Sequence, residues 1–201
     1  MKQQSRAFET ELPANYRAVL TIDAKNTRFG VIMNLVALAV LALCVGLTLL
    51  ALPAFDFWEE FGQHTLVRYL IFFAVMIAYI ILHELTHGAA YKLLTRRKLT
   101  FGLTLTVAYC GVPDIYVTRR TALIALLAPF LTFLPVFFIP IFLLPMNIDK
   151  ILCAFCLGMH IGGCSGDLYD TFLLLFRFRS PATLMQDTGP KQTFYLPEEN
   201  A

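Results

Sequence analysis

The sequence predicts an all-α polytopic membrane protein with four transmembrane helices and a small cytoplasmic β-hairpin between the second and the third. Three observations support this fold class. The 201-residue chain is 58% hydrophobic and 15% charged, with a mean hydropathy of +0.66, which is too apolar for an ordinary water-soluble domain. It contains apolar runs of about 20 residues, the length that crosses ~30 Å of hydrocarbon as a helix. Its basic residues are also distributed very unevenly between these runs.

Four apolar stretches are long enough to be spans, and they leave room for one compact membrane domain. They are roughly residues 31–53, 66–94, 122–145 and 151–176. The first thirty residues carry several charges and no apolar core of a signal peptide, so we expect the first span itself to direct insertion.

The basic residues predict the orientation of these spans. Fourteen of the sixteen Lys and Arg residues lie before the first span, between spans two and three, or after span four. Cytoplasmic segments near spans carry such an excess, so both termini should be cytoplasmic. We therefore expect a cytoplasmic N-terminal segment (1–30), a membrane-embedded domain (31–179) and a cytoplasmic C-terminal tail (180–201). The net charge of +2 follows from this topology, and no nucleic-acid partner is predicted.

The loop between spans two and three predicts the hairpin. Apolar and small or polar residues alternate strictly over 99–109, which is typical of a strand with one apolar face. The segment CGVPD (110–114) predicts a turn and IYVT (115–118) a short return strand. An exposed edge of such a hairpin could bind a substrate as an added strand. A purely structural hairpin is an equally good interpretation.

The second span contains the motif HELTH, at residues 83–87, directly after fourteen uncharged residues (69–82). On a helix the i, i+4 spacing places His83 and His87 on one face, where both imidazoles can bind one metal ion. Glu84 then lies beside a water bound to that metal. A glutamate in a span costs on the order of 2.5–3.5 kcal/mol on insertion scales, so such a group predicts a functional site.

A catalytic zinc site usually has three protein ligands, and the fourth span offers His160, Asp167 and Asp170 as candidates for the third. Distance from the cytoplasmic end of each helix, at ~1.5 Å per residue, measures depth. His87 lies nine residues before Arg96 and Asp167 ten before Arg177, so their levels match. Asp170 is shallower and turned about 60° away, while His160 is about 10 Å deeper. Asp167 is thus the predicted third ligand, and His160 is a candidate for lining the site.

Small residues and charge balance favour this helix contact. Gly158, Gly162 and Gly166 form a GxxxGxxxG series, which serves close helix packing within the chain or dimerisation. Zn²⁺, the carboxylates of Asp167 and Glu84 and two neutral imidazoles sum to zero charge, which avoids unpaired charge in lipid.

The same residues suggest a reaction. Zinc activates water and polarises a carbonyl, and Glu84 can act as general base and then pass the proton to a leaving amine. Hydrolysis of a peptide bond in a membrane-associated polypeptide is the predicted reaction. Fe²⁺ or Co²⁺ would also suit such ligands.

The stretches HELTHG, AYCGVPDIYVTRRTALIALLAP and HIGGCSGD together resemble the putative zincin peptidase family of bacterial membrane proteins, which is similar in plan to site-2-protease-type intramembrane metalloproteases. The likeness covers roughly 66–179, with a weaker echo in the tail LMQDTGPKQTFYLPEE. It implies His83 and His87 as zinc ligands, Glu84 as catalytic base, Asp167 as third ligand and the bacterial plasma membrane as location. Site-2 proteases usually carry an NPxPxxxLDG-like motif around the aspartate, where this chain has GCSGDLYD.

A non-enzymatic metal-binding membrane protein is the alternative: a transporter, a scaffold or an inactive peptidase relative. A transporter needs polar ligands on several spans, but uncharged polar groups are few there, such as Asn34 on span one and Thr132 on span three. The predicted partners are therefore the lipid bilayer and a membrane-associated polypeptide substrate.

Overall fold

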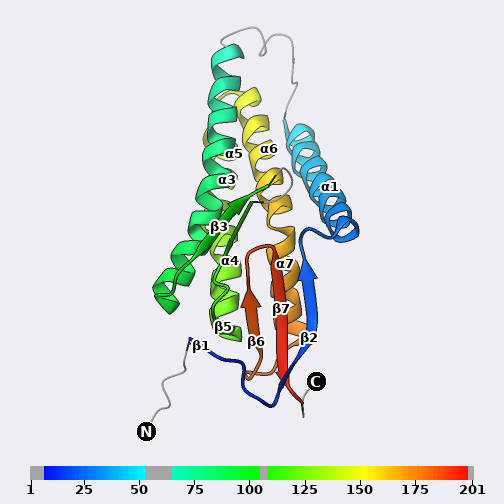
Figure 1. The fold of residues 1–201 in the computed structure, drawn as a ribbon. Helices are drawn as coiled ribbons and strands as arrows, with labels where there is room; N and C mark the ends of the chain where they lie inside the picture. Colours follow the sequence, from blue (N-terminus) through cyan, green and yellow to red (C-terminus); the bar gives the residue numbers. More distant parts are fainter. Residues whose placement is uncertain (1–6, 53–64, 105–107, 199–201) are drawn as a thin grey trace. The chain divides into compact units, whose positions relative to one another are not determined.

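The computed structural model describes residues 7–52, 65–104 and 108–198 (Figure 1). The chain forms two compact units, each built from separate stretches of sequence. The first, here called the sheet unit, comprises Met1–Gly30, His83–Pro129 and Gly166–Ala201. The second, the helical unit, comprises Val31–Leu82 and Phe130–Ser165.

The prediction of an all-α fold is wrong, because the sheet unit contains a five-stranded antiparallel sheet. Its order is β1-β5-β6-β7-β2, and Figure 1 shows β7 between β6 and β2. The strands are β1 (Phe8–Glu9), β2 (Tyr16–Asp23), β5 (Tyr116–Thr118), β6 (Leu184–Asp187) and β7 (Lys191–Pro197). Both terminal segments supply strands, and β2 pairs with β7 from the far end of the chain. Such long-range pairing leaves little local signal, which is why the sheet was not predicted.

The hairpin between the second and third long helices is also built from other strands than those predicted. β3 (Thr100–Leu103) pairs with β4 (Ala108–Gly111), so β3 and the first half of β4 come from the predicted first strand and the second half of β4 from the predicted turn. The predicted return strand instead supplies β5, which pairs with β1 and β6. Residues 105–107 of the predicted strand lie outside the described residues.

The apolar stretches are helical, but not as four uninterrupted helices. The helices are α1 (Thr27–Ala51), α3 (Thr65–Thr95), α4 (Arg119–Phe138), α5 (Pro140–Leu143), α6 (Asn147–Gly163) and α7 (Ser165–Phe172), followed by the π-helix η1 (Leu173–Arg177). In the described part of the chain, α1, α3 and the α4–α5 segment are long and apolar enough to cross a membrane. The α6 and α7–η1 pair is bent, and makes a fourth candidate only if it counts as one span.

Two local signals set the helix boundaries. The side chain of Asn26 accepts hydrogen bonds from the backbone N–H groups of Arg28 and Phe29, at 3.0 and 3.3 Å, and so caps the start of α1. α3 ends where Arg96 adopts a φ of 57°, the left-handed conformation that commonly terminates helices.

The core of the sheet unit joins the sheet to the helices that belong to the same unit. Phe194 is fully buried and stacks on Phe178 with ring centroids 5.1 Å apart. The core also takes in Tyr91 from α3, Ala125 from α4 and Leu174 from η1. The C-terminal part of α3, which carries the HELTH motif, is therefore packed directly into the core of this unit.

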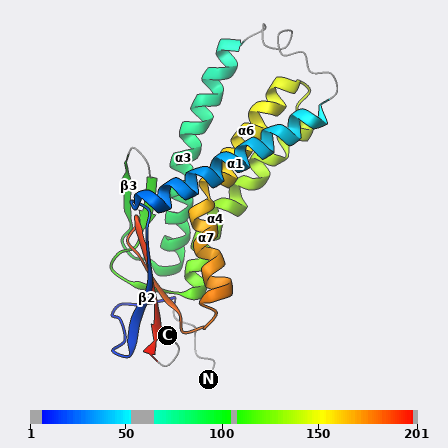
Figure 2. The same ribbon diagram turned by 90° about the vertical axis from the view of Figure 1, so that its right-hand side faces the viewer.

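In the helical unit, α1 crosses α6 at the predicted small-residue series (Figure 2). A Cβ atom at Gly158 would lie 2.7 Å from the Leu41 Cα, and one at Gly162 would lie 2.8 Å from the Ala37 Cα. These two glycines therefore serve close packing within the chain, one of the two interpretations that the sequence allowed. A Cβ atom at Gly166 would meet nothing within 4 Å.

Candidate metal centre

The two histidines of HELTH lie on one face of α3, as the spacing predicts. α3 is continuous through the motif, so His83 and His87 are one turn apart, with ring centroids separated by 5.0 Å. Both residues are buried, at 8% and 7% exposure. Two imidazoles buried this closely can bind one ion together.

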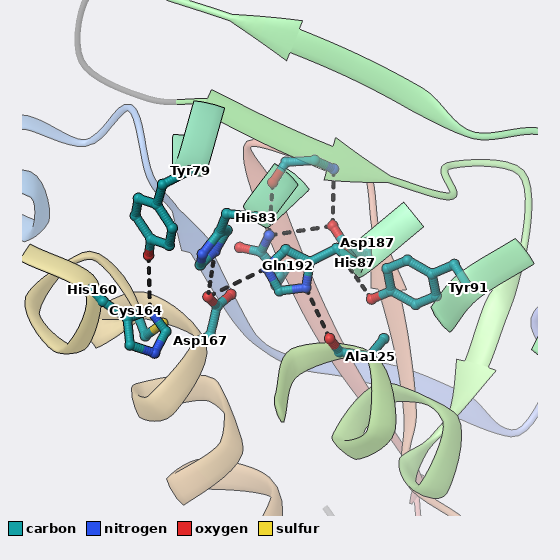
Figure 3. A network of polar contacts seen from close by, with 11 residues as sticks. Tyr79, His83, His87, Tyr91, Ala125, His160, Cys164, Asp167, Asp187 and Gln192 are labelled. Atoms are coloured by element: carbon teal, nitrogen blue, oxygen red, sulfur yellow. Dashed lines mark hydrogen bonds and ion pairs between the residues drawn. The ribbon is translucent and has the colours of Figure 1, made fainter. Parts of the chain in front are cut away.

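Asp167, on α7, brings a carboxylate oxygen to both histidines (Figure 3). Its Oδ2 lies 3.5 Å from the His83 Nε2 and 3.4 Å from the His87 Nε2. Charge-assisted hydrogen bonds are shorter, at about 2.7–2.9 Å. Ligands at about 2.0–2.1 Å from a tetrahedral zinc are about 3.3 Å from one another. Both distances therefore match the separation of two ligands on one zinc ion, and the donor set fits zinc.

A hydrogen bond of the Nδ1 atom, the ring nitrogen that faces away from Asp167, fixes the orientation of His87. The His87 Nδ1–H donates to the backbone carbonyl of Ala125 on α4 over 2.8 Å. This bond leaves the Nε2 lone pair free on the side of Asp167. A carbonyl acceptor behind a histidine ligand is the usual way in which proteins set its tautomer and its ring orientation.

Glu84, the predicted base, follows the first histidine on α3. The residue is partly buried, and its carboxylate interacts electrostatically with His83, His87 and Asp167. It does not belong to the His83, His87 and Asp167 group whose ligand atoms all lie within 4.8 Å of one another. Its carboxylate is therefore not one of the three clustered ligand atoms.

The other two candidates of the fourth predicted span have different surroundings. His160 belongs to the helical unit, where its Nε2–H donates to the Phe130 carbonyl over 3.2 Å and its Nδ1 accepts from the Tyr79 hydroxyl over 2.9 Å. Asp170 is buried at 4% exposure, and its Oδ1 has no hydrogen-bond partner among the described residues. Asp170 does not belong to the group formed by Asp167 and the two histidines.

Sequence reasoning missed a second carboxylate, that of Asp187 at the end of β6. Its Oδ2 accepts a hydrogen bond of 2.6 Å from the hydroxyl of Tyr91, four residues after His87 on α3. Burial raises the pKa of Asp187 from 3.8 to about 6, although its hydrogen bonds oppose the shift. The i, i+4 spacing from His87 could have singled out Tyr91, but nothing local to the tail indicates Asp187.

Comparison with protein families agrees with this geometry. A family model described as "Putative zincin peptidase" matches residues 76–181, more than half of the chain. The chain belongs to this family. Zinc is accordingly the cofactor of this zincin peptidase, and metallopeptidase activity is its function at the level of the family. Neither a curated protein nor a solved structure matches the chain.

The matched segment contains the HELTH motif and Asp167, so all four residues predicted from the sequence lie inside it. It ends before β6 and β7, which supply Asp187. The residue of this zincin peptidase that bonds to Tyr91 therefore lies outside the matched segment.

Proposed function

We propose that this zincin peptidase hydrolyses peptide bonds of a membrane-associated polypeptide, with His83, His87 and Asp167 as zinc ligands and Glu84 as general base. The observation that supports it most is the spacing of the Asp167 Oδ2 at 3.4 and 3.5 Å from two imidazole nitrogens. These distances are longer than charge-assisted hydrogen bonds and match the separation of ligand atoms around a tetrahedral zinc.

Zinc bound at these residues would lower the pKa of water towards ~7 and polarise a carbonyl oxygen. The remaining chemistry belongs to the side chains. Glu84 accepts the proton of the attacking water on its carboxylate and delivers it to the nitrogen of the leaving amine. The Ala125 carbonyl accepts the Nδ1–H of His87, so the Nε2 of this ring is the atom that would bind the metal. Asp167 contributes the negative charge that a divalent cation requires.

The surroundings of the site favour a substrate in or at the membrane. Both histidines and Asp167 belong to helices that are candidate spans or parts of one. The side chain of Asp167 is 22% exposed, against 10% and 9% for the histidines, so a substrate would approach on the aspartate side. We place residues 31–179 in the bacterial plasma membrane as a multi-pass domain. The segments 1–30 and 180–201, with both termini, are then cytoplasmic, in keeping with the distribution of Lys and Arg.

The test is the variant Glu84→Gln, which keeps the shape of the side chain and removes its basicity. Wild type and variant are purified in detergent, and their zinc content and cleavage of labelled casein are measured. Cleavage of a single-span test polypeptide is measured in liposomes. We expect wild-type zinc content and a loss of cleavage of at least about 100-fold, because general base catalysis contributes about 10²–10⁴-fold. Glu198→Gln, at an exposed position of the sheet unit, is the matched control.

Equal cleavage by wild type and Glu84→Gln would contradict the proposed role of Glu84. Zinc binding without cleavage of either substrate by the wild-type protein would favour the non-enzymatic alternative. Cleavage of casein but not of the span in liposomes would contradict the membrane-embedded substrate and leave the peptidase assignment intact.

A further inference from the structure

The C-terminal hairpin of β6 and β7 makes a direct polar contact with the face of α3 that carries the two histidines. Tyr91 follows His87 by four residues, so it occupies the same helix face one turn further on. Its side chain is almost fully buried, at 1% exposure. The Tyr91 hydroxyl donates to the Asp187 Oδ2 over 2.6 Å, and both side chains appear beside His87 in Figure 3.

The Asp187 carboxylate is itself held firmly by its own hairpin. Its Oδ1 accepts from the Gly189 N–H at 2.9 Å and from the Gln192 Nε2 at 3.2 Å. The same Nε2 donates to the Gly189 carbonyl at 2.7 Å, so both of its hydrogens are used. With three donors around it, the carboxylate cannot follow a moving Tyr91 without losing other hydrogen bonds.

The turn between β6 and β7, which contains Gly189, packs against β4. Gly189 has a φ of 97°, and a Cβ atom there would lie 2.3 Å from the ring of Tyr109. A Cβ atom at Gly111 would lie 2.3 Å from the Gly189 nitrogen, so the two backbones touch. The Val112 N–H donates to the Asp187 carbonyl over 2.8 Å. The position of Asp187 is thus set by two sheets rather than by a free loop.

We infer that Asp187 is a positioning residue for the metal centre and acts through Tyr91 on the rotation of α3 about its own axis. A helix side chain reaches about 5–6 Å from that axis, so a rotation of ~10° displaces its tip by about 1 Å. Metal–ligand distances tolerate only about ±0.2 Å. The Ala125 carbonyl on α4 fixes the His87 ring. Asp187 on β6 fixes the next turn of α3 through the hydroxyl of Tyr91.

This inference rests on the proposed zinc site, and it is tested by metal affinity rather than by cleavage. Tyr91→Phe removes only the hydroxyl. Asp187→Asn replaces the carboxylate, which has two acceptor oxygens, by an amide with one acceptor oxygen and one NH₂ donor. Tyr195→Phe is the matched control, because the Tyr195 hydroxyl bonds to the Gln186 Oε1 at 3.3 Å in the same hairpin without reaching α3. The measurements are zinc affinity by chelator competition and the visible spectrum of the cobalt-substituted protein, with circular dichroism as the check on folding.

We expect Tyr91→Phe and Asp187→Asn each to weaken zinc binding about 10-fold or more and to alter the cobalt spectrum. Losses of about 10–100-fold are typical when a group that orients metal ligands is replaced. The double variant should lose little more than the stronger single variant, because both act through one hydrogen bond. Tyr195→Phe should bind zinc within 2-fold of wild type.

A folded Tyr91→Phe protein with zinc affinity within 2-fold of wild type and an unchanged cobalt spectrum would overturn the inference, even if Asp187→Asn fails to fold. An equal loss of affinity in Tyr195→Phe would also overturn it, because the effect would then be one of general stability. A wild-type protein that binds no zinc would overturn the inference and the proposed function together. A wild-type protein that binds zinc but cleaves nothing would contradict only the peptidase proposal, since the affinities can still be compared.

Discussion

Replacing Asp187 by asparagine should change how the free energy of unfolding of the metal-free protein depends on pH. Burial raises the pKa of this carboxyl from 3.8 to about 6, against the opposing hydrogen bonds from Tyr91, Gly189 and Gln192. At about 1.4 kcal/mol per pKa unit, this difference corresponds to about 3 kcal/mol. Asparagine does not titrate, so the variant lacks this contribution.

The sign follows from the protons bound in each state. Between pH 3.8 and about 6 the folded protein keeps the Asp187 proton that the unfolded chain has lost. The stability that this group contributes is therefore complete below pH 3.8 and is lost as the pH rises through about 6. From pH 4 to 6.5 the wild type should lose about 2 kcal/mol more than Asp187→Asn.

The assay is equilibrium unfolding of both proteins in mixed micelles at several pH values, followed by circular dichroism. Asp23→Asn is a control of opposite sign. Slight burial opposes the shift at Asp23, but the hydrogen bond from the Lys25 N–H and the ion pair with Lys191 lower the pKa of this carboxyl. A wild-type minus Asp187→Asn difference that stays constant within about 0.5 kcal/mol over this range would refute the reasoning.

Three further substitutions test the packing. Phe194→Ala should destabilise the protein by about 3–5 kcal/mol, because it empties the fully buried centre of the sheet-unit core; the unfolding free energy measures this. Gly162→Ala should cost about 1–3 kcal/mol, since the added methyl would lie 2.8 Å from the Ala37 Cα, and the thermal midpoint should fall. Gly189→Ala should cost at least about 1–3 kcal/mol because of the φ of 97° and the nearby Tyr109 ring, with proteolysis of the tail as the readout.

Gly46→Ala, in α1, is the control for both glycine substitutions. A Cβ atom at Gly46 would meet nothing within 4 Å, so alanine should stabilise the helix by up to about 1 kcal/mol. Equal thermal midpoints for Gly162→Ala and Gly46→Ala would contradict the close packing of α1 on α6. A wild-type rate of proteolysis of the tail in Gly189→Ala would contradict the contact of Gly189 with Tyr109. A Phe194→Ala protein as stable as wild type would contradict the central place of Phe194 in the core.

Local patterns predicted the helices and the motif, and long-range pairing explains what they missed. Apolar run length places α1 and α3 within a few residues, because one helix depends mainly on its own sequence. The spacing of His83 and His87 is likewise a property of a single helix. β2 was missed because its partner, β7, comes from the other end of the chain.

The contact of Asp167 with the two histidines could be predicted from the sequence, and that of Asp187 with Tyr91 could not. Matching depths along two helices singled out Asp167, and the structure brings its Oδ2 to both histidines. Asp187 lies in the tail, and its contact with Tyr91 exists only once β6 has joined the sheet. A position that depends on sheet topology is not visible in a local sequence pattern.

X-ray absorption spectroscopy of the zinc-loaded wild-type protein tests the central claim most directly, because it reports the atoms around the metal. The spacing of His83, His87 and Asp167 predicts two imidazole rings, oxygen in the remaining positions and no sulfur. A zinc–sulfur distance of about 2.3 Å, or scattering from a single imidazole, would contradict this coordination shell.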